Sequence, residues 1–274
     1  LVMGLGMQLI AWPDALVQAL AAAGYRVTRH DNRDVGLSQS FDELGAPNLA
    51  WALLRQKLGL RLRPPYTLGE MAQDALGMLD ALGVARAHVM GVSMGGMIAQ
   101  RMALAAPERL LSLTSVMSTS GARGLPGPTP EVQRAMLARP RDAQAMLERS
   151  VRLFQMIGGP GFPTPAAELR TRVAAAMARA NRPQGVQRQL LAILADATRA
   201  EQLARISTPT LVIHGRADPL VPLAGGEDTA RRIPGARLAV VEGMGHDLPP
   251  GVVDRMLPLL LPHFAAHSLH TSVS

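Results

Sequence analysis

Gly91-Val92-Ser93-Met94-Gly95-Gly96 places a serine between glycines, directly after an apolar run, residues 87–90, that is typical of a buried strand. The residues that follow, 97–104, have a helical pattern. A serine at a strand-to-helix turn takes a strained backbone conformation, and its neighbours must be small because a Cβ atom would collide with nearby backbone. The three glycines of this stretch meet that demand. It therefore predicts a nucleophile elbow, with the Ser93 oxygen at the positive end of a helix.

An acid and a histidine follow the serine in the order that an elbow-type catalytic triad demands. A short β-branched run, residues 210–214, leads into a loop that places Asp218 just past the carboxyl end of a strand. The next strand is expected over residues 238–242, and the loop beyond it carries His246. We expect Ser93 to attack an acyl carbon, His246 to take and return its proton, and Asp218 to orient the imidazole ring.

Ser93 and Asp218 also have simpler interpretations. Ser93 fits an ordinary tight turn, and Asp218 fits a turn aspartate before a proline. Asp247 is the nearest alternative to Asp218 as the acid. Because Asp247 is adjacent to His246, we expect it to point elsewhere on the same loop, away from the ring Nδ1 atom.

Together these residues resemble the serine hydrolases of the α/β-hydrolase fold, and the likeness covers nearly the whole chain. Within that family, five stretches are most similar to the esterase branch that includes aclacinomycin methylesterase: Met3-Gly4-Leu5-Gly6, Trp12-Pro13, Gly24-Tyr25-Arg26-Val27, residues 31–38 and Gly243-Met244-Gly245-His246. Family members usually carry two further strands before the run that begins here at Leu1. We therefore expect that the numbered chain omits an upstream segment; the alternative is a fragment with an exposed strand edge.

An oxyanion hole needs two backbone N–H donors, each worth about 3 kcal/mol of transition-state stabilisation. Met94, directly after the nucleophile, is expected to supply one of them. The resemblance assigns the other to Leu5, which Gly4 and Gly6 flank so that the loop can approach the substrate oxygen. The alternative is an ordinary glycine turn.

Helices and strands alternate along most of the chain, which predicts an α/β protein with a mostly parallel, doubly wound sheet, as the α/β-hydrolase resemblance also implies. Residues 1–120 are expected to form the first part of this core and residues 208–274 the second. Strands are expected at 1–3, 25–30, 86–92, 110–117, 210–214 and 238–242, and helices at 14–23, 68–82, 94–106 and 251–266.

The alternation breaks between residues 121 and 207, where we expect helices at 132–137, 141–156, 165–180 and 186–194 and no strand. The resemblance implies that this insertion is a cap above Ser93. Its apolar side chains have little aromatic content, and Phe154, Met156 and Val221 are the candidates for the substrate pocket. A surface insertion without substrate contact is the alternative.

Composition excludes several classes of partner. The formal charge is +7, but the arginines are dispersed and aromatic residues make up only 3% of the chain, so we expect no nucleic-acid partner. The chain has no cysteine, and no apolar stretch is long enough for a membrane span, so we expect a cytoplasmic protein without a membrane partner. Secretion stays open because the start of the chain looks incomplete.

No cofactor or nucleotide motif is present, and we expect no metal. His263 and His267 have the spacing of a metal pair on a helix, and His270 follows. No carboxylate is set among them, which favours a solvated helix face.

The sequence thus predicts a cofactor-free carboxylic ester hydrolase that forms an acyl-enzyme on small to medium apolar esters. A cofactor-free haloperoxidase or perhydrolase, which forms a peracid from an acyl-enzyme, is one alternative. A non-catalytic ligand receptor of the same fold is the other, although such receptors commonly lose residues of the triad. The sequence does not predict the oligomeric state.

Overall fold

The computed structural model describes residues 1–138 and 141–268 of the 274-residue chain. Its centre is a parallel four-stranded sheet with the order β1-β2-β3-β4. The strands are β1 (Ala87–Val92), β2 (Leu110–Val116), β3 (Thr210–Gly215) and β4 (Arg237–Val241). A parallel sheet flanked by helices confirms the predicted α/β class.

Helices make up most of the remaining structure. They are α1 (Asp14–Ala22), α2 (Leu49–Lys57), α3 (Leu68–Ala81), α4 (Met94–Ala105), α5 (Pro130–Leu137), α6 (Ala143–Ile157), α7 (Ala166–Arg179), α8 (Pro183–Ala195), α9 (Arg199–Gln202), α10 (Leu223–Arg232) and α11 (Pro250–Ala265). Short 3-10 turns lie at Leu9–Ala11, Asp42–Leu44, Pro107–Arg109 and Leu203–Arg205.

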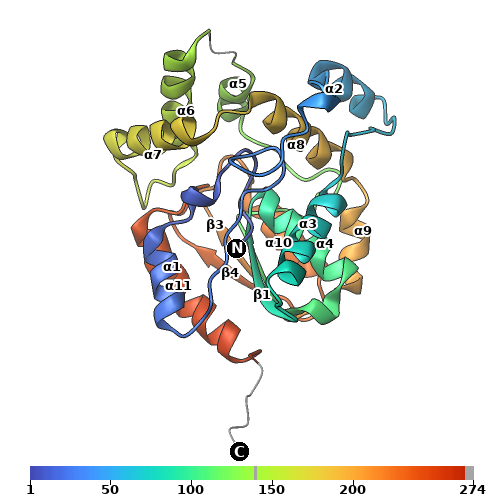
Figure 1. Cartoon of the computed structure of the whole chain (residues 1–274), viewed down its shortest axis with the longest axis vertical. Coiled ribbons are helices and arrows are strands. Elements are labelled where there is room, and N and C mark those ends of the chain that lie inside the picture. Colours follow the sequence, from blue (N-terminus) through green and yellow to red (C-terminus); the bar gives the residue numbers. More distant parts are fainter. Residues whose placement is uncertain (139–140, 269–274) are drawn as a thin grey trace, which may run out of the picture.

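Helices cover both faces of the sheet, with α3 and α4 on one face and α1 and α11 on the other (Figure 1). Successive residues of a strand point to opposite faces, so neighbouring side chains enter different cores. In β1, Val89 packs into the cluster formed with α3 and α4, whereas Met90 packs into the cluster formed with α1 and α11. This two-sided burial explains why nearly every residue of β1 to β3 is buried and why exposed polar residues do not alternate with apolar ones.

Two predicted strands are not strands in the structure. Val2 forms only an isolated parallel bridge with Gly91, and residues 25–30 lie outside any strand. Between these two segments of the described chain, one main-chain hydrogen bond forms, from the Leu1 amino group to the Thr28 carbonyl at 2.7 Å. A β-ladder needs repeated bonds of this kind, so this pairing is too short to make a strand.

The segment between β2 and β3 is helical, with α5 to α9 and no strand among its described residues. The bounds of α5 to α8 agree with the predicted helices within a few residues. Figure 1 shows these four helices gathered beyond one end of the sheet. No helix in the described ranges combines the length and the apolar character that crossing a membrane requires.

Candidate active site

Ser93 lies between β1 and α4 in a backbone conformation that few residues other than glycine adopt, with φ 55° and ψ −120°. Its N–H donates to the Val116 carbonyl of β2 at 2.9 Å, and its own carbonyl accepts a hydrogen bond from the Ser118 hydroxyl at 2.7 Å. These bonds fix the turn against the neighbouring strand. The Ser93 side chain is thereby held at the N-terminus of α4, where the helix dipole favours negative charge.

Three glycines allow the chain to pass tightly around Ser93. A Cβ atom on Gly91 would lie 2.0 Å from the Gly95 carbonyl oxygen, and one on Gly95 would lie 2.0 Å from that of Val2. A Cβ on Gly96 would lie 2.6 Å from the Ser118 Cβ. Because two of these neighbours are backbone atoms that cannot move aside, the glycines of the motif are required by packing as well as by the turn.

Asp218 and His246 lie within hydrogen-bond distance of each other. The Asp218 Oδ2 atom accepts a hydrogen bond from the His246 Nδ1 atom at 2.7 Å, and both side chains are buried. Asp218 Oδ1 accepts the N–H groups of Leu220 at 2.9 Å and of Val221 at 2.8 Å. A carboxylate fixed in this way holds the ring with its Nε2 atom free to accept a proton. Among the described residues, His246 makes no hydrogen bond to the Ser93 hydroxyl.

Asp247 has a different partner. Its carboxylate accepts two hydrogen bonds from the Arg172 guanidinium of α7, at 3.1 and 3.2 Å, and a longer one from the Thr164 hydroxyl at 3.4 Å. Asp247 therefore joins the loop that carries His246 to the helices inserted between β2 and β3, while Asp218 contacts the ring.

The loop that contains Leu5 passes over Ser93. A Cβ on Gly4 would lie 3.2 Å from the Ser93 Cβ and 3.7 Å from its Oγ, so the loop backbone and the serine are in close contact. Within the described chain, the N–H groups of Leu5 and Met94 donate no hydrogen bond to other protein groups. Two unpaired N–H groups beside a serine can receive a negatively charged oxygen.

Helix α8 fixes the position of this loop through Gln189, which is fully buried. The Gln189 Oε1 atom accepts the Gly6 N–H at 2.9 Å, and its Nε2 atom donates to the Arg33 carbonyl at 2.7 Å. One side chain thus holds two loops that follow different segments of the core. Gln189 could not be predicted from the sequence, since nothing in the local pattern marks it.

A buried ion pair lies next to Gln189 on the same helix. Arg188 donates to both carboxylate oxygens of Asp34, at 2.7 and 2.8 Å, and to Asp42 at 2.8 Å. The Tyr66 hydroxyl donates to Asp34 at 2.6 Å. Burial alone would raise the pKa of Asp34, but the hydrogen bonds from Arg188 and Tyr66 outweigh it and lower that pKa. Asp34 and Arg188 are fully buried, so α8 is bound to the core by a paired charge.

The segment between α6 and α7 contacts the histidine loop through backbone atoms. The His246 N–H donates to the Ile157 carbonyl at 2.7 Å, and the Gly161 N–H donates to the Gly243 carbonyl at 3.0 Å. A Cβ on Gly159 would lie 2.1 Å from the Gly243 oxygen. The inserted helices are therefore in contact with the His246 loop and, through α8, with the Leu5 loop.

The three predicted pocket residues have different surroundings. Val221 lies beside the acid, donating its N–H to Asp218 and accepting a hydrogen bond at its carbonyl from His214 at 2.8 Å. Phe154 packs in a small apolar cluster between α6 and α7, with the Arg172 guanidinium 5.9 Å from its ring centre. Met156 is 38% exposed. No contact in the described chain joins these three residues into one surface.

From the sequence, His214 is expected only at a strand end on the rim of the site, yet it contacts the acid. It is fully buried at the end of β3, and its Nε2 atom lies 3.7 Å from the Asp218 Oδ2. Burial lowers the pKa of His214, which favours a neutral ring. A histidine at the carboxyl end of a predicted strand, four residues before the acid, was the available signal.

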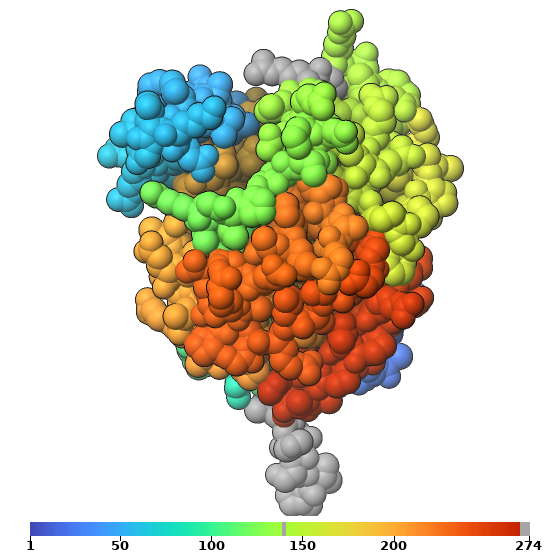
Figure 2. Space-filling model, turned by 180° about the vertical axis from the view of Figure 1, so that it is seen from behind, coloured from blue at the N-terminus to red at the C-terminus, as the bar shows by residue number. Residues whose placement is uncertain are grey.

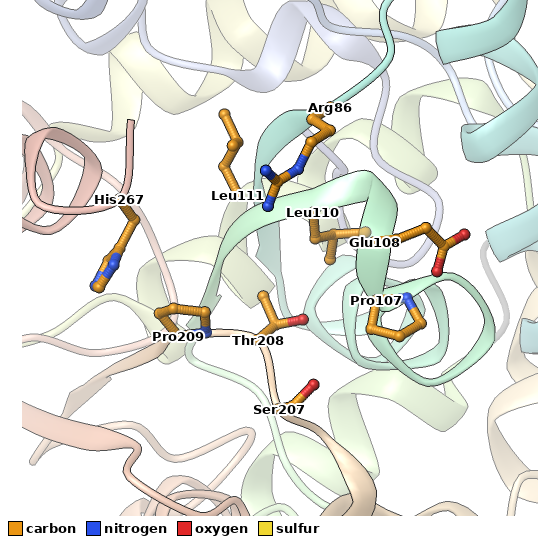
Figure 3. A pocket seen from close by; sticks show the side chains of 9 residues that line it. All are labelled: Arg86, Pro107, Glu108, Leu110, Leu111, Ser207, Thr208, Pro209 and His267. Carbon is orange, nitrogen blue, oxygen red and sulfur yellow. The ribbon is translucent and has the colours of Figure 1, made fainter. Parts of the chain in front are cut away.

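Away from these residues, a cavity of about 440 Å³ lies between Leu110 at the start of β2 and residues 207–209, just before β3 (Figure 3). Its walls include Arg86, Glu108, Thr208 and His267. It therefore opens at the amino ends of the strands, opposite the end from which Ser93 and Asp218 follow. Sites in parallel α/β sheets lie at the carboxyl ends, so this cavity is separate from the candidate site.

The predicted solvated face around His263 is wrong, because His263 is buried against the core. It packs against Phe264 and His267 at ring-centre distances of 6.1 and 5.2 Å. His270 lies outside the described residues. Within the described ranges, no group of three or more His, Cys, Asp or Glu side chains is arranged to hold a metal ion.

The chain is similar to known hydrolases in sequence and in fold. The model of the alpha/beta hydrolase fold family matches residues 1–249. Rhodomycin D methylesterase DauP of Streptomyces sp. strain C5 is 34% identical, and rhodomycin D methylesterase DnrP of Streptomyces peucetius is 33% identical. Each alignment covers 97% of this chain and 90% of the relative.

A crystal structure of a hydrolase from Pseudomonas aeruginosa PA01 is also similar, with a TM-score of 0.66 and 26% identity over 97% of this chain and 87% of that one. The similarity to two methylesterases over nearly the full length supports an esterase or a related hydrolase that acts on a small molecule.

Proposed function

This chain belongs to the alpha/beta hydrolase fold family, and from that premise we propose that it is a carboxylic ester hydrolase of the EC 3.1.1 type. It uses Ser93 as nucleophile, His246 as general base and acid, and Asp218 as the group that orients the ring. The substrates are small to medium apolar esters. The observation that carries the proposal is the buried Asp218–His246 hydrogen bond in a chain whose Ser93 sits in a strained elbow.

In the first half of the reaction, the Ser93 oxygen attacks the ester carbonyl carbon while His246 Nε2 takes the hydroxyl proton. The resulting tetrahedral intermediate expels the alcohol, which leaves with that proton. In the second half, His246 removes a proton from water, and the hydroxide formed attacks the acyl-enzyme. Collapse of this second intermediate releases the carboxylic acid and returns the proton to Ser93.

The N–H groups of Leu5 and Met94 stabilise the oxyanion in both intermediates. Support comes from the contact of Gly4 with Ser93 and from the absence of other partners for these two groups in the described chain. Backbone donors that are already fixed need no rearrangement as charge develops, which is the basis of their catalytic effect.

Residues 121–207 form a helical cap between two parts of the core, residues 1–120 and 208–274. The cap shapes the substrate site, whose apolar wall combines Phe154 and Met156 of the cap with Val221 of the loop after β3. Contacts of α8 with Gly6 and of Ile157 with His246 support this role, because they join the insertion to both sides of the candidate site. The names of the two methylesterases support a methyl or other small alkyl ester as the bond cleaved.

Hydrolysis of p-nitrophenyl esters tests the proposal. Ser93→Ala is expected to lower kcat by about 10⁶-fold, since the residues of a triad act as a unit, while the thermal unfolding midpoint stays unchanged. Ser207→Ala, which alters an exposed serine at the opposite end of the sheet, is the matched control and should keep full activity. Turnover retained by Ser93→Ala would refute the proposal.

A further inference from the structure

The surface of this protein concentrates its exposed apolar side chains in one segment, residues 44–60. Large hydrophobic side chains that are substantially exposed number twelve among the described residues, and six of them lie here. They are Leu44, Trp51, Leu53, Leu54, Leu58 and Leu60, with exposed fractions from 39% to 63%. Scattered exposed leucines are common, but a cluster of this kind marks a binding surface.

Helix α2, within this segment, presents its apolar side to solvent. Its one buried residue is Ala52, on the side of the helix that faces α8. At 100° per residue, Leu54 lies almost opposite Ala52, and Trp51 and Leu53 lie on either flank of the outer side. A surface helix normally buries its large apolar residues and exposes its polar ones. This helix exposes its large apolar residues along with the polar Gln56 and Lys57, so its own fold does not account for the exposed apolar side chains.

Charge restricts what can cover the surface. All four charged residues between positions 44 and 65 are basic: Arg55, Lys57, Arg61 and Arg63. Asp42 and Glu43 directly precede Leu44, but Asp42 already pairs with Arg188. From Arg55 onward the surface offers only cations, which a second copy of the same surface would leave without carboxylate partners. The partner therefore carries negative charge beside an apolar layer that can accept tryptophan and leucine side chains.

Shape favours a lipid surface over an acidic protein. Figure 2 shows the segment in light blue as a lobe that projects from one corner of the molecule. A projecting lobe enters a soft, deformable layer readily, whereas a protein partner would need a matching hollow. Tryptophan and leucine on one side of a helix, with arginine and lysine beside them, are typical of helices that lie in a membrane interface.

We propose that residues 44–63 bind the surface of an anionic phospholipid bilayer, with Trp51, Leu54 and Leu58 in the interface and the basic residues at the headgroups. The expectation of no membrane partner rested on the absence of a spanning segment, and surface binding needs none. The proposal stands apart from the proposed esterase activity, because it uses none of the residues assigned to catalysis.

Cosedimentation with vesicles tests it. The intact chain is mixed with vesicles of equal parts phosphatidylcholine and phosphatidylglycerol, and separately with vesicles of pure phosphatidylcholine. We expect binding to the anionic vesicles, weaker binding to the neutral ones, and release at high salt, since screening removes the electrostatic part. Trp51 fluorescence should shift to shorter wavelength on binding, while Trp12 is buried in the core and should report no change.

Double variants separate the apolar contribution to vesicle binding from the electrostatic one. Leu54→Ser with Leu58→Ser, and Arg61→Glu with Arg63→Glu, should each weaken binding to the anionic vesicles by about ten-fold or more. The matched controls are Leu82→Ser and Arg255→Glu, which change an exposed leucine and an exposed arginine elsewhere and should bind as the unmodified chain does. Circular dichroism checks that every variant is folded.

Three results would overturn the proposal. The first is failure of the unmodified chain to bind anionic vesicles. The second is binding that the double variants leave unchanged. The third is self-association that the leucine variants abolish while vesicle binding is absent, which would identify a second copy as the occupant.

Discussion

The elbow around Ser93 and helix α8, one of the helices inserted between β2 and β3, are held by different kinds of contact. At the elbow, glycine backbone packs on glycine backbone, and a Cβ on Gly91 would meet the Gly95 oxygen at 2.0 Å. Helix α8 is held instead by side chains, above all by the buried Arg188–Asp34 pair. Backbone packing leaves almost no freedom, whereas an ion pair can be altered one partner at a time. The packing of α8 can therefore be altered by mutation while the elbow is left intact.

Replacing the acid Asp218 tests the core, and it has the largest effect expected among the variants that follow. Asp218→Asn should lower kcat by about 10⁴-fold, because an amide at this position favours the wrong imidazole tautomer. Asp247→Asn is the matched change on the same loop, and it should cost far less, since Asp247 binds Arg172. Ester hydrolysis by the two purified variants measures both. Equal losses, or the reverse order, would assign the acid to Asp247.

Breaking the Arg188–Asp34 ion pair tests how α8 is held on the core. Arg188→Met should destabilise the fold by about 3–5 kcal/mol, because it leaves the buried Asp34 carboxylate without its guanidinium partner. Adding Asp34→Asn should restore part of that loss by removing the charge. Urea unfolding measures the free energies, with Arg134→Met at an exposed position of α5 as control. An Arg188→Met protein as stable as the control would show that the pair does not hold α8.

Acid unfolding is a second test of the stability that the Arg188–Asp34 pair contributes. The pKa of Asp34 is lowered below its ordinary value of 3.8 in the folded state. Its contribution to stability is therefore fully present above that value and is lost as the pH falls through the lowered pKa. The free energy of unfolding should fall more steeply below pH 3.8 in the unmodified chain than in the Arg188→Met, Asp34→Asn double variant. Identical pH profiles would contradict this account.

Gln189 lies where the two regions meet, so its removal should have an intermediate effect on rate. Gln189→Met keeps the volume but leaves the Gly6 N–H without an acceptor, which should disorder the loop of Leu5 and lower kcat by about ten-fold with little change in KM. Gln189→Glu retains an acceptor and should restore part of kcat. Gln184→Met, exposed on the same helix, is the control. A change confined to KM would exclude a role at the oxyanion.

The smallest expected effect concerns the apolar side chains of the inserted helices. Phe154→Ser and Met156→Ser should change the dependence of kcat/KM on acyl-chain length more than they change the rate on acetate esters. Each added methylene in such a pocket contributes about 1–3 kcal/mol at most. Leu137→Ser, at an exposed position of α5, is the control. If both variants kept the dependence of kcat/KM on acyl-chain length unchanged, the insertion would have no part in substrate specificity. Specificity would then come from the loops around Leu5, Met94 and Val221.

The sequence predicted those parts of the structure that contacts between nearby residues determine. The glycines around Ser93 are required by contacts within a few residues of the turn and with the adjacent strand, so the motif predicts the elbow. The alternation of strands and helices likewise predicted β1 to β4 closely. Asp218 and His246 could be named because parallel strands bring their carboxyl ends to one edge of the sheet.

Contacts between distant parts of the chain could not be predicted. Arg188 lies 154 positions from its partner Asp34, and no local pattern marks either residue as half of a buried pair. Helix α10 was missed because Gly225 and Gly226 indicate a turn. The structure gives them another role, since a Cβ on Gly226 would lie 2.4 Å from the His214 ring. Helix α2 was missed because residues 49–54 are apolar without interruption and show no helical spacing of apolar and polar residues.

Covalent labelling with a fluorophosphonate tests the central claim most directly, because this reagent phosphonylates an activated serine nucleophile far faster than an ordinary serine. Intact-protein mass spectrometry of the unmodified chain should show one added phosphonyl group, and peptide mapping should place it on Ser93. Ser93→Ala should gain none, and Asp218→Asn should react far more slowly. An unmodified chain that is not labelled, or a Ser93→Ala variant labelled as fast as the unmodified chain, would contradict the account.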